Sequence, residues 1–318
     1  MRHRRLGDSG LAVSIVGLGC NNFGRRIGEA ATREVVAAAL DAGITLFDTA
    51  DTYRGQFGFS EELLGRALQG RRDDVVIATK FGNDMAGAYG PDWGARGSRR
   101  YIRQAVEASL RRLGTDWIDL YQLHTPDPAT PIAETLAALT ELVREGKVRY
   151  IGSSNLAAWQ VVDADWTAHS AHLERFISAQ NYYNLLHREA EAELTPACLR
   201  TGVGILPFFP LANGLLTGKY SRGEPPPAGS RLANRPGELT DPVFDALEAI
   251  ERYAEERGLS VLDVAIGGLA AQAGVASVIA GATKPEQVHA NAAAGLWEAT
   301  AADLAALDAV VPTPRKES

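Results

Sequence analysis

Residues 33–47, REVVAAALDAGITLF, contain the pattern that decides the fold. The first part places valine, alanine and leucine at helical spacing and ends at Gly43, and the second part is the short apolar run ITLF. A glycine directly after a helix can adopt the positive φ that ends it, and an apolar run without polar alternation is typical of a strand buried on both faces. The segment therefore predicts a helix that leads into a buried parallel strand.

The same unit recurs along the chain. The helix-ending glycines are Gly43, Gly70, Gly114, Gly146 and Gly202. The expected strands are Ile15–Leu18, Ile44–Phe47, Val75–Thr79, Ile118–Leu123, Tyr150–Ser153, Phe176–Gln180, Gly204–Pro207 and Ser277–Ala280. Eight βα units in 318 residues predict an α/β fold of the (β/α)8, or TIM barrel, type. A doubly wound sheet is the rival, but GLGCNNFG at residues 17–24 does not fit the Gly-x-Gly-x-x-Gly fingerprint.

Two segments depart from this rhythm. Residues 208–239 are rich in glycine and proline and predict a long loop after the seventh strand, over one end of the barrel. Residues 300–312, TAADLAALDAVVP, predict an extra C-terminal helix packed outside the barrel. Neither segment resembles a separate domain, so we expect one domain over residues 1–318.

Composition narrows the function classes. A net charge of −7, from 39 acidic and 32 basic residues, argues against nucleic acid as a partner and favours a small molecule. Two cysteines, Cys20 and Cys198, are too few for a disulfide framework and fit a reduced, cytoplasmic setting as small buried residues. No export signal or membrane span is expected: the apolar stretch from Val261 predicts a helix and then a buried strand.

Polar residues follow several expected strands at the barrel end where catalysis takes place. Asp48 follows ITLF, Lys80 follows VVIAT and His124 follows DLYQL, while Tyr53 lies in the loop just after Asp48. Each of the four could have a purely structural role. Because these three strands are neighbours in a barrel, however, we expect the four side chains to meet at one mouth.

This combination suits the protonation of an oxygen. A tyrosine keeps its proton at neutral pH, a nearby lysine ammonium stabilises the phenolate, and a carboxylate keeps the lysine charged. Tyr53, Lys80 and Asp48 take these roles, and a neutral His124 would orient the substrate oxygen. Protonation is useful when a hydride attacks the adjoining carbon, which requires a nicotinamide. Residues suited to gripping its carboxamide and stacking on its ring are Ser154, Asn155, Gln180 and Phe208.

The motifs that carry these residues resemble those of the aldo-keto reductase superfamily over nearly the whole chain. They are FDTADTY with SEELLGRAL, VVIATKFG, DLYQLHTPD, GSSNLAAWQ and SAQNYYNLLHR. The resemblance implies a (β/α)8 barrel, a nicotinamide bound without a Rossmann domain, and reversible reduction of an aldehyde or ketone to the alcohol. It also implies that Tyr53 is the general acid of a tetrad completed by Asp48, Lys80 and His124.

Two further segments resemble the family's contacts to the rest of the cofactor. PFFPLANGLLTGKY and IAGATKPEQVHAN implicate Pro210, Leu211, Lys219, Gly281, Thr283, Gln287 and Asn291. Thr283 to Glu286 also fits a capping box, so a structural role for Thr283 stays open. The family's usual stacking tyrosine or tryptophan is Phe208 here, and no arginine occurs between Ile279 and Asn291, where Lys284 could substitute. We expect NADPH, with NADH possible.

The substrate pocket is expected around Asn21, Phe23, Tyr89 and Trp93, together with the proline-rich loop. No metal site is expected. Lys80 also permits a Schiff-base lyase, although Asp48 would keep the lysine charged and therefore unreactive. Barrels resembling this family also serve as accessory subunits of potassium channels, so a nicotinamide-binding regulatory subunit is the alternative function. The sequence does not identify the substrate, the physiological direction of the reaction or the oligomeric state.

Overall fold

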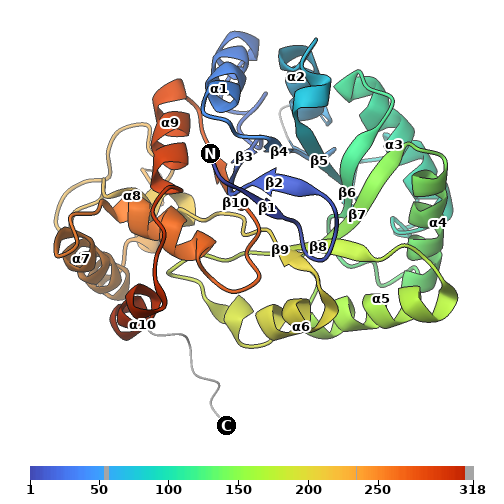
Figure 1. Ribbon diagram of the computed structural model, residues 1–318. Helices are drawn as coiled ribbons and strands as arrows, with labels where there is room; N and C mark the ends of the chain where they lie inside the picture. Colours follow the sequence, from blue (N-terminus) through green and yellow to red (C-terminus); the bar gives the residue numbers. More distant parts are fainter. Residues whose placement is uncertain (54–56, 234, 312–318) are drawn as a thin grey trace.

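Eight parallel strands form one curled sheet in the order β10-β3-β4-β5-β6-β7-β8-β9 (Figure 1). The computed structural model describes residues 1–53, 57–233 and 235–311; residues 54–56, 234 and 312–318 lie outside the description. The strands are β3 (Val16–Gly19), β4 (Leu46–Asp48), β5 (Val76–Phe81), β6 (Ile118–Leu123), β7 (Val148–Ser154), β8 (Phe176–Gln180), β9 (Gly204–Ile205) and β10 (Val278–Gly281).

The order of the strands excludes the doubly wound alternative. Each strand from β3 to β8 pairs with the next one along the chain, and the last, β10, pairs with the first, β3. A doubly wound sheet instead reverses direction at a switch point. Parallel bridges from Ile205 to Val275 and from Phe208 to Ile279 join the β9 end of the sheet to the β10 end. This arrangement is consistent with the predicted (β/α)8 barrel.

Helices cover the outer side of the sheet (Figure 1). They are α1 (Glu29–Asp41), α2 (Phe59–Ala67), α3 (Arg99–Leu113), α4 (Ile132–Arg144), α5 (Ala158–Ala171), α6 (Leu194–Thr201) and α9 (Pro285–Ala294). The eight predicted strands are all present, with ends within two residues of the predicted ones. The five predicted helix-ending glycines all have positive φ, between 65° and 78°.

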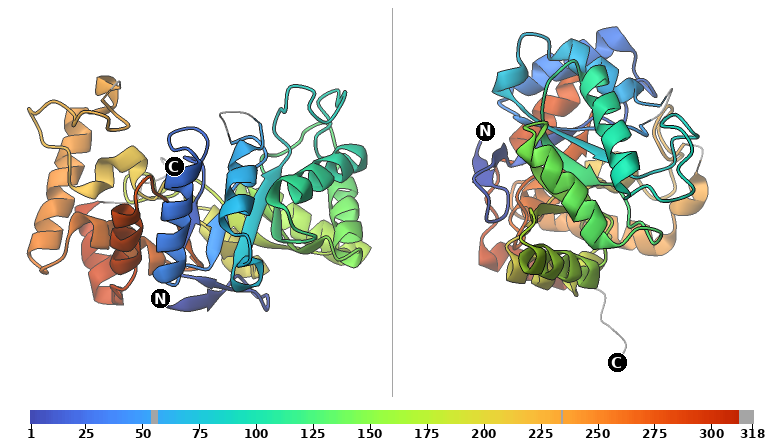
Figure 2. Two further views of the ribbon diagram at one scale, coloured as in Figure 1. Left: turned by 90° about the horizontal axis from the view of Figure 1, so that it is seen from above. Right: turned by 90° about the vertical axis from the view of Figure 1, so that its right-hand side faces the viewer.

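A two-stranded antiparallel hairpin, which the sequence did not predict, precedes the curled sheet. It consists of β1 (His3–Arg5) and β2 (Ala12–Ser14). Figure 2 shows it at the end of the sheet opposite to the segment between β9 and α7. Leu6 and Val13 are fully buried and pack with Leu46 and Leu120 from the strands. The hairpin therefore covers the N-terminal end of the sheet and leaves the C-terminal end for the site.

The segment after β9 contains two short 3-10 helices, Ala212–Thr217 and Pro236–Glu238, and leads to α7 (Asp241–Glu255). The short helix α8 (Val261–Asp263) continues into a π-helix at Val264–Gly268, and β10 follows, as predicted for this apolar stretch. Within the part of the chain that the structure describes, no helix has the length and apolar character needed to cross a bilayer.

The predicted C-terminal helix is α10 (Ala301–Val310), which packs against α7. Pro312, the last residue of the predicted segment, lies outside the described residues. Cys20 and Cys198 are both free and buried, as expected.

Candidate active site

The ends of three neighbouring strands bring four predicted residues together. Asp48 is the last residue of β4, Lys80 the penultimate residue of β5, and His124 directly follows β6. Tyr53 comes from the loop between β4 and α2. The pairing of β4 with β5 and of β5 with β6 places these positions side by side.

Lys80 is the centre of this group. Its Nζ donates to both carboxylate oxygens of Asp48, at 2.8 and 2.7 Å, and to the backbone oxygen of Thr49 at 2.9 Å. It also lies 3.0 Å from the hydroxyl oxygen of Tyr53. The side chain of Lys80 is fully buried, so its donors are used inside the protein.

Charge and burial set the protonation states of this group. Burial by itself would lower the pKa of Lys80, but the Asp48 carboxylate and the Tyr53 hydroxyl outweigh burial and raise it. Lys80 is therefore an ammonium at neutral pH, which opposes the Schiff-base alternative. Burial raises the pKa of the Tyr53 phenol, and the nearby ammonium only partly offsets this effect. The phenol consequently holds its proton until an acceptor arrives.

His124 stands next to Tyr53, with the two ring centroids 6.1 Å apart and the planes almost perpendicular, at 79°. Burial, and then the charge of Lys80, lower the pKa of His124 to about 3. Its Nδ1 is buried without a hydrogen-bond partner among the described residues. His124 is therefore a neutral imidazole at physiological pH.

The side chains predicted to grip a carboxamide adjoin the same group. Gln180 Nε2 donates a 2.8 Å hydrogen bond to Asp48 Oδ1. The amide of Asn155 donates to the His124 backbone oxygen at 3.0 Å and to Ser154 Oγ at 3.1 Å. Asn155 has a φ of 59°, unusual for a residue other than glycine, so its turn is held by these contacts.

A cavity of about 730 Å³ opens beside these residues and continues toward α9. Asp48, Tyr53 and His124 line it, whereas Lys80 lies beneath its wall. The predicted cofactor residues that line it are Ser154, Asn155, Gln180, Phe208, Pro210, Leu211, Lys219, Gly281, Thr283, Gln287 and Asn291. The cavity therefore brings all eleven together.

Phe208 reaches the cavity from the end of an aromatic stack. Its ring is nearly parallel to that of Tyr182, at 14° and 5.7 Å between centroids, and Tyr182 is stacked on His187 at 4.0 Å. Its backbone nitrogen donates to Asn181 oxygen at 3.0 Å. The Phe208 ring is therefore packed against the ring of Tyr182, a contact that the sequence did not predict.

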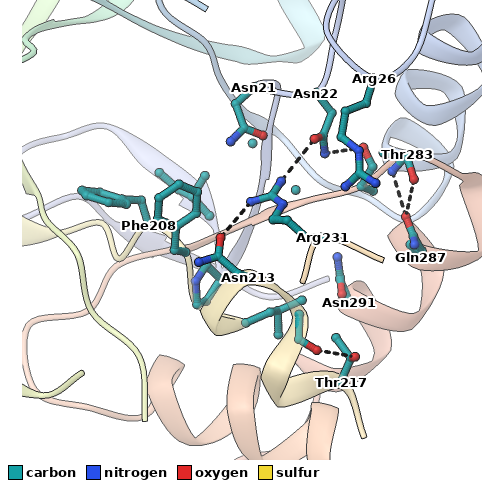
Figure 3. A pocket seen from close by; sticks show the side chains of 18 of the residues that line it. Asn21, Asn22, Arg26, Phe208, Asn213, Thr217, Arg231, Thr283, Gln287 and Asn291 are labelled. Atoms are coloured by element: carbon teal, nitrogen blue, oxygen red, sulfur yellow. Dashed lines mark hydrogen bonds between the residues drawn. The ribbon is translucent and has the colours of Figure 1, made fainter. Parts of the chain in front are cut away.

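The structure adds an arginine that sequence reasoning missed. Arg231, from the proline-rich segment, lines the cavity between Asn22 and Asn213 (Figure 3). It donates to the side-chain oxygens of both asparagines at 3.3 Å and forms no ion pair with a described carboxylate. Burial, and then the charges of Arg26 and other arginines, lower its pKa. A guanidinium without a counter-ion in a cavity is suited to an anionic ligand.

Further cations lie along the same cavity. Arg26, Lys219 and Lys284 line it together with Arg231. Arg26 donates a 3.1 Å hydrogen bond to the backbone oxygen of Gly229 and so connects the loop after β3 to the proline-rich segment. Residues 227–231 of that segment line the cavity.

Three predicted pocket residues are not at the cavity. Asn21 lines it, but Phe23, Tyr89 and Trp93 are not among the described residues that do. Phe23 is fully buried in the core. The hydroxyl of Tyr89 is hydrogen-bonded to Asp51 and Arg112, and the side chain is only 7% exposed. Trp93 is 78% exposed and packs on Arg100. The predicted aromatic wall therefore does not line this cavity.

The capping box that the sequence predicts at the start of α9 does not form. Lys284, not Thr283, is the N-cap residue of α9. Gln287 Oε1 accepts from the Thr283 backbone nitrogen at 2.8 Å and from its hydroxyl at 3.1 Å. Thr283 and Gln287 are thus linked to each other at the cavity wall, and Glu286 is not the partner.

A cavity with ionisable residues at the C-terminal ends of parallel strands is the arrangement of a barrel enzyme. The chain belongs to the aldo/keto reductase family, whose model matches residues 15–312. It is an oxidoreductase of this family.

Three relatives show the range of the similarity. A probable voltage-gated potassium channel subunit beta of Oryza sativa subsp. japonica is 36% identical over 305 residues, 92% of this chain and 90% of that protein. Versiconal hemiacetal acetate reductase of Aspergillus parasiticus is 38% identical over 294 residues, 84% of each chain. L-glyceraldehyde 3-phosphate reductase of Escherichia coli is 35% identical over 303 residues, 92% of this chain and 86% of that protein.

Proposed function

We propose that the protein, a single (β/α)8 barrel domain over residues 1–318, reduces an aldehyde or ketone to the alcohol with NADPH, and that Tyr53 donates the proton. The observation that carries this proposal is the Tyr53 hydroxyl at the cavity wall, 3.0 Å from the buried Lys80 ammonium. The names of two relatives, which describe reductases, support the same reaction class.

The roles of the side chains follow from their protonation states. A carbonyl oxygen between Tyr53 and His124 would accept a hydrogen bond from the phenol and another from the neutral imidazole. The phenol then gives up its proton, and the Lys80 ammonium stabilises the phenolate that remains. Asp48 keeps Lys80 charged and fixes its position through both oxygens. When bound, the reduced nicotinamide supplies the hydride that attacks the carbonyl carbon.

The residues along the cavity fit a dinucleotide. Ser154, Asn155, Gln180 and Phe208 would hold the nicotinamide end beside Tyr53. Pro210, Leu211, Lys219, Arg26 and Arg231 would surround the phosphates, and Gly281, Thr283, Gln287 and Asn291 the adenosine. Arg231, which has no described carboxylate partner, is the observation that favours phosphate. Lys284 adds a cation near the adenosine end, so we propose NADPH over NADH.

The test is the loss of NADPH absorbance with a panel of aliphatic and aromatic aldehydes and ketones. We expect wild type to turn over and Tyr53→Phe to lose about 100-fold or more of kcat, since general acid catalysis contributes this much. Both should bind NADPH equally in a fluorescence titration. The matched control is Tyr150→Phe, which changes a partly buried tyrosine packed near the N-terminal hairpin. Equal rates for wild type and Tyr53→Phe would contradict the proton-donor role.

A regulatory role is the second candidate, because two similar proteins carry the name of a probable potassium channel subunit beta. Very tight NADPH retention with no turnover on the whole panel would favour it. The close Tyr53–Lys80 contact favours the reductase, since binding a nicotinamide alone does not need a proton donor.

A further inference from the structure

Behind the loop that carries Tyr53, a chain of polar side chains connects distant elements. Thr79 of β5 donates a 2.6 Å hydrogen bond to Glu61 of α2, and Arg112 of α3 donates another, also 2.6 Å, to the same carboxylate. Arg112 Nη2 donates to the Tyr89 hydroxyl at 2.9 Å. Tyr89 in turn donates to Asp51 Oδ2 at 3.3 Å. The proton donation described above uses none of these five side chains directly.

Both ends of this chain of contacts adjoin the proposed proton donor and its lysine. Thr79 precedes Lys80, and Asp51 lies two residues before Tyr53. The backbone nitrogen of Asp51 donates to the Lys80 oxygen at 3.2 Å, and its oxygen accepts from Gly58 nitrogen at 2.6 Å. The backbone of Asp51 is thus tied to β5 on one side and to the start of α2 on the other. Its side chain provides a further contact that can position the Tyr53 loop.

The Asp51 carboxyl receives its side-chain hydrogen bond from Tyr89, and the backbone of Thr52 adds a further contact. Asp51 is fully buried, and Tyr89 is its only side-chain donor in the described part of the chain. Asp51 Oδ1 has no hydrogen-bond partner among the described residues. Burial and the neighbouring Glu61 raise the pKa of Asp51 well above its ordinary value. This shift favours the neutral form of the Asp51 carboxyl, while Arg112 forms its ion pair with Glu61.

Gly58, at the other end of the loop that carries Tyr53, packs directly against Arg112. Gly58 has a φ of 78°, and a Cβ at this position would lie 2.2 Å from Arg112 Nε. Both ends of the loop are therefore placed by the Arg112 guanidinium. Gly58 approaches it directly, and Asp51 is connected to it by the Tyr89 hydroxyl.

We propose that Tyr89 is a positioning residue for Tyr53: its hydroxyl holds Asp51 against Arg112 and so sets the approach of the Tyr53 hydroxyl to Lys80. The inference rests on the proposed carbonyl reduction and extends it to a residue outside the cavity. Without the Tyr89 hydroxyl, Asp51 loses its side-chain donor and the loop can shift. A shift of 1 Å in a reacting group can cost roughly 100-fold in rate.

The test compares two buried tyrosines that pack edge to face, 5.3 Å apart. Tyr89→Phe removes the bond to Asp51, whereas the control Tyr101→Phe removes a 2.8 Å bond to the backbone oxygen of Asn83. In Tyr89→Phe we expect kcat to fall about 10-fold or more. NADPH affinity should stay at the wild-type value. The solvent deuterium isotope effect on kcat should rise, because proton transfer becomes slower. Tyr101→Phe should match wild type in all three.

The outcomes separate this inference from the function on which it rests. If wild type reduces carbonyls and Tyr89→Phe keeps its kcat and isotope effect, the positioning role is overturned and the reductase stands. If wild type is inert on the whole panel, the proposed carbonyl reduction and the positioning role of Tyr89 are both contradicted. If Tyr89→Phe does not fold, Asp51→Asn and Asp51→Leu replace it. The asparagine can still accept from Tyr89, so its kcat should exceed that of the leucine variant, and equal values overturn the proposal.

Discussion

Gln180 at the end of β8 donates a 2.8 Å hydrogen bond to Asp48 at the end of β4, so strands on opposite sides of the curled sheet share one carboxylate. Asp48 also accepts from Lys80 at both oxygens. A carboxylate can accept at each of its lone pairs, and here it accepts from the Lys80 ammonium, from the Gln180 amide and, at 3.5 Å, from the Gln122 amide. Gln180 therefore supports the Lys80–Asp48 pair in addition to its proposed contact with a carboxamide.

Asp48→Asn should destabilise the fold as well as slow the reaction. Lys80 stays fully buried, and without the carboxylate its charge has no counter-ion among the described residues, which costs about 3–5 kcal/mol in the free energy of unfolding. Urea denaturation at pH 7 measures this loss. The control is Glu29→Gln on α1, which breaks exposed ion pairs to Arg33 and Arg66 and should change the midpoint little. Similar midpoint shifts for both variants would contradict the argument.

Because His124 is buried as a neutral imidazole, the free energy of unfolding should decrease as the pH falls below 6.5. Its folded pKa is about 3, and its ordinary pKa is 6.5, so between these values the unfolded chain binds a proton that the folded chain does not. The resulting decrease in the free energy of unfolding is at most about 1.4 kcal/mol per pH unit. The contribution is complete above pH 6.5 and is lost as the pH falls toward 3.

Denaturation at pH 7 and pH 5 checks the contribution of His124. The difference in the free energy of unfolding between the two pH values should be smaller for His124→Gln than for wild type. His289→Gln, a change at an exposed position on α9, should keep the wild-type difference. An unchanged difference in His124→Gln would show that the imidazole is not held neutral.

The strands and the residues at their ends could be predicted because both depend on local pattern. An apolar run without polar alternation predicts a buried strand from its own residues, and strand order then determines which ends meet. Asp48, Lys80 and His124 were therefore predicted together, and the structure brings them together. The eleven residues expected to line a cofactor cavity came from motifs directly after strands or in the family's known segments, and they all line one cavity.

Residues whose place depends on distant contacts could not be predicted. Tyr89 lies in a glycine-rich loop that suggested a rim, but Asp51 and Arg112, 38 and 23 residues away, hold its hydroxyl inside. Arg231 lies in a segment without helical or strand periodicity. Its path to the cavity is set by Asn22, 209 residues away, and by the contact of Arg26 with Gly229 across 203 residues.

The ring at position 208 should matter more than a hydroxyl there. Phe208 is supported by the stacked ring of Tyr182, so it can present a flat face without a hydrogen bond of its own. Phe208→Ala should raise the dissociation constant of NADPH about 10-fold, since an aromatic pair contributes up to about 1.5 kcal/mol beyond its buried area. Phe208→Tyr should bind close to wild type. Equal weakening in both variants, measured by fluorescence titration, would rule out stacking as the reason.

Arg231 should control the affinity for NADPH but not the chemical step. It lies in the cavity without a described carboxylate partner, so a phosphate would provide its counter-ion. Arg231→Met should raise the KM for NADPH about 10- to 100-fold, the equivalent of one charge-assisted hydrogen bond, and leave kcat near wild type. Arg235→Gln is the control in the same segment, because this exposed arginine is already paired with Glu238. Steady-state kinetics at saturating carbonyl substrate measure both constants. If Arg231→Met lowers kcat and leaves KM unchanged, the arginine acts on the reacting end of the cavity and not on the cofactor phosphates.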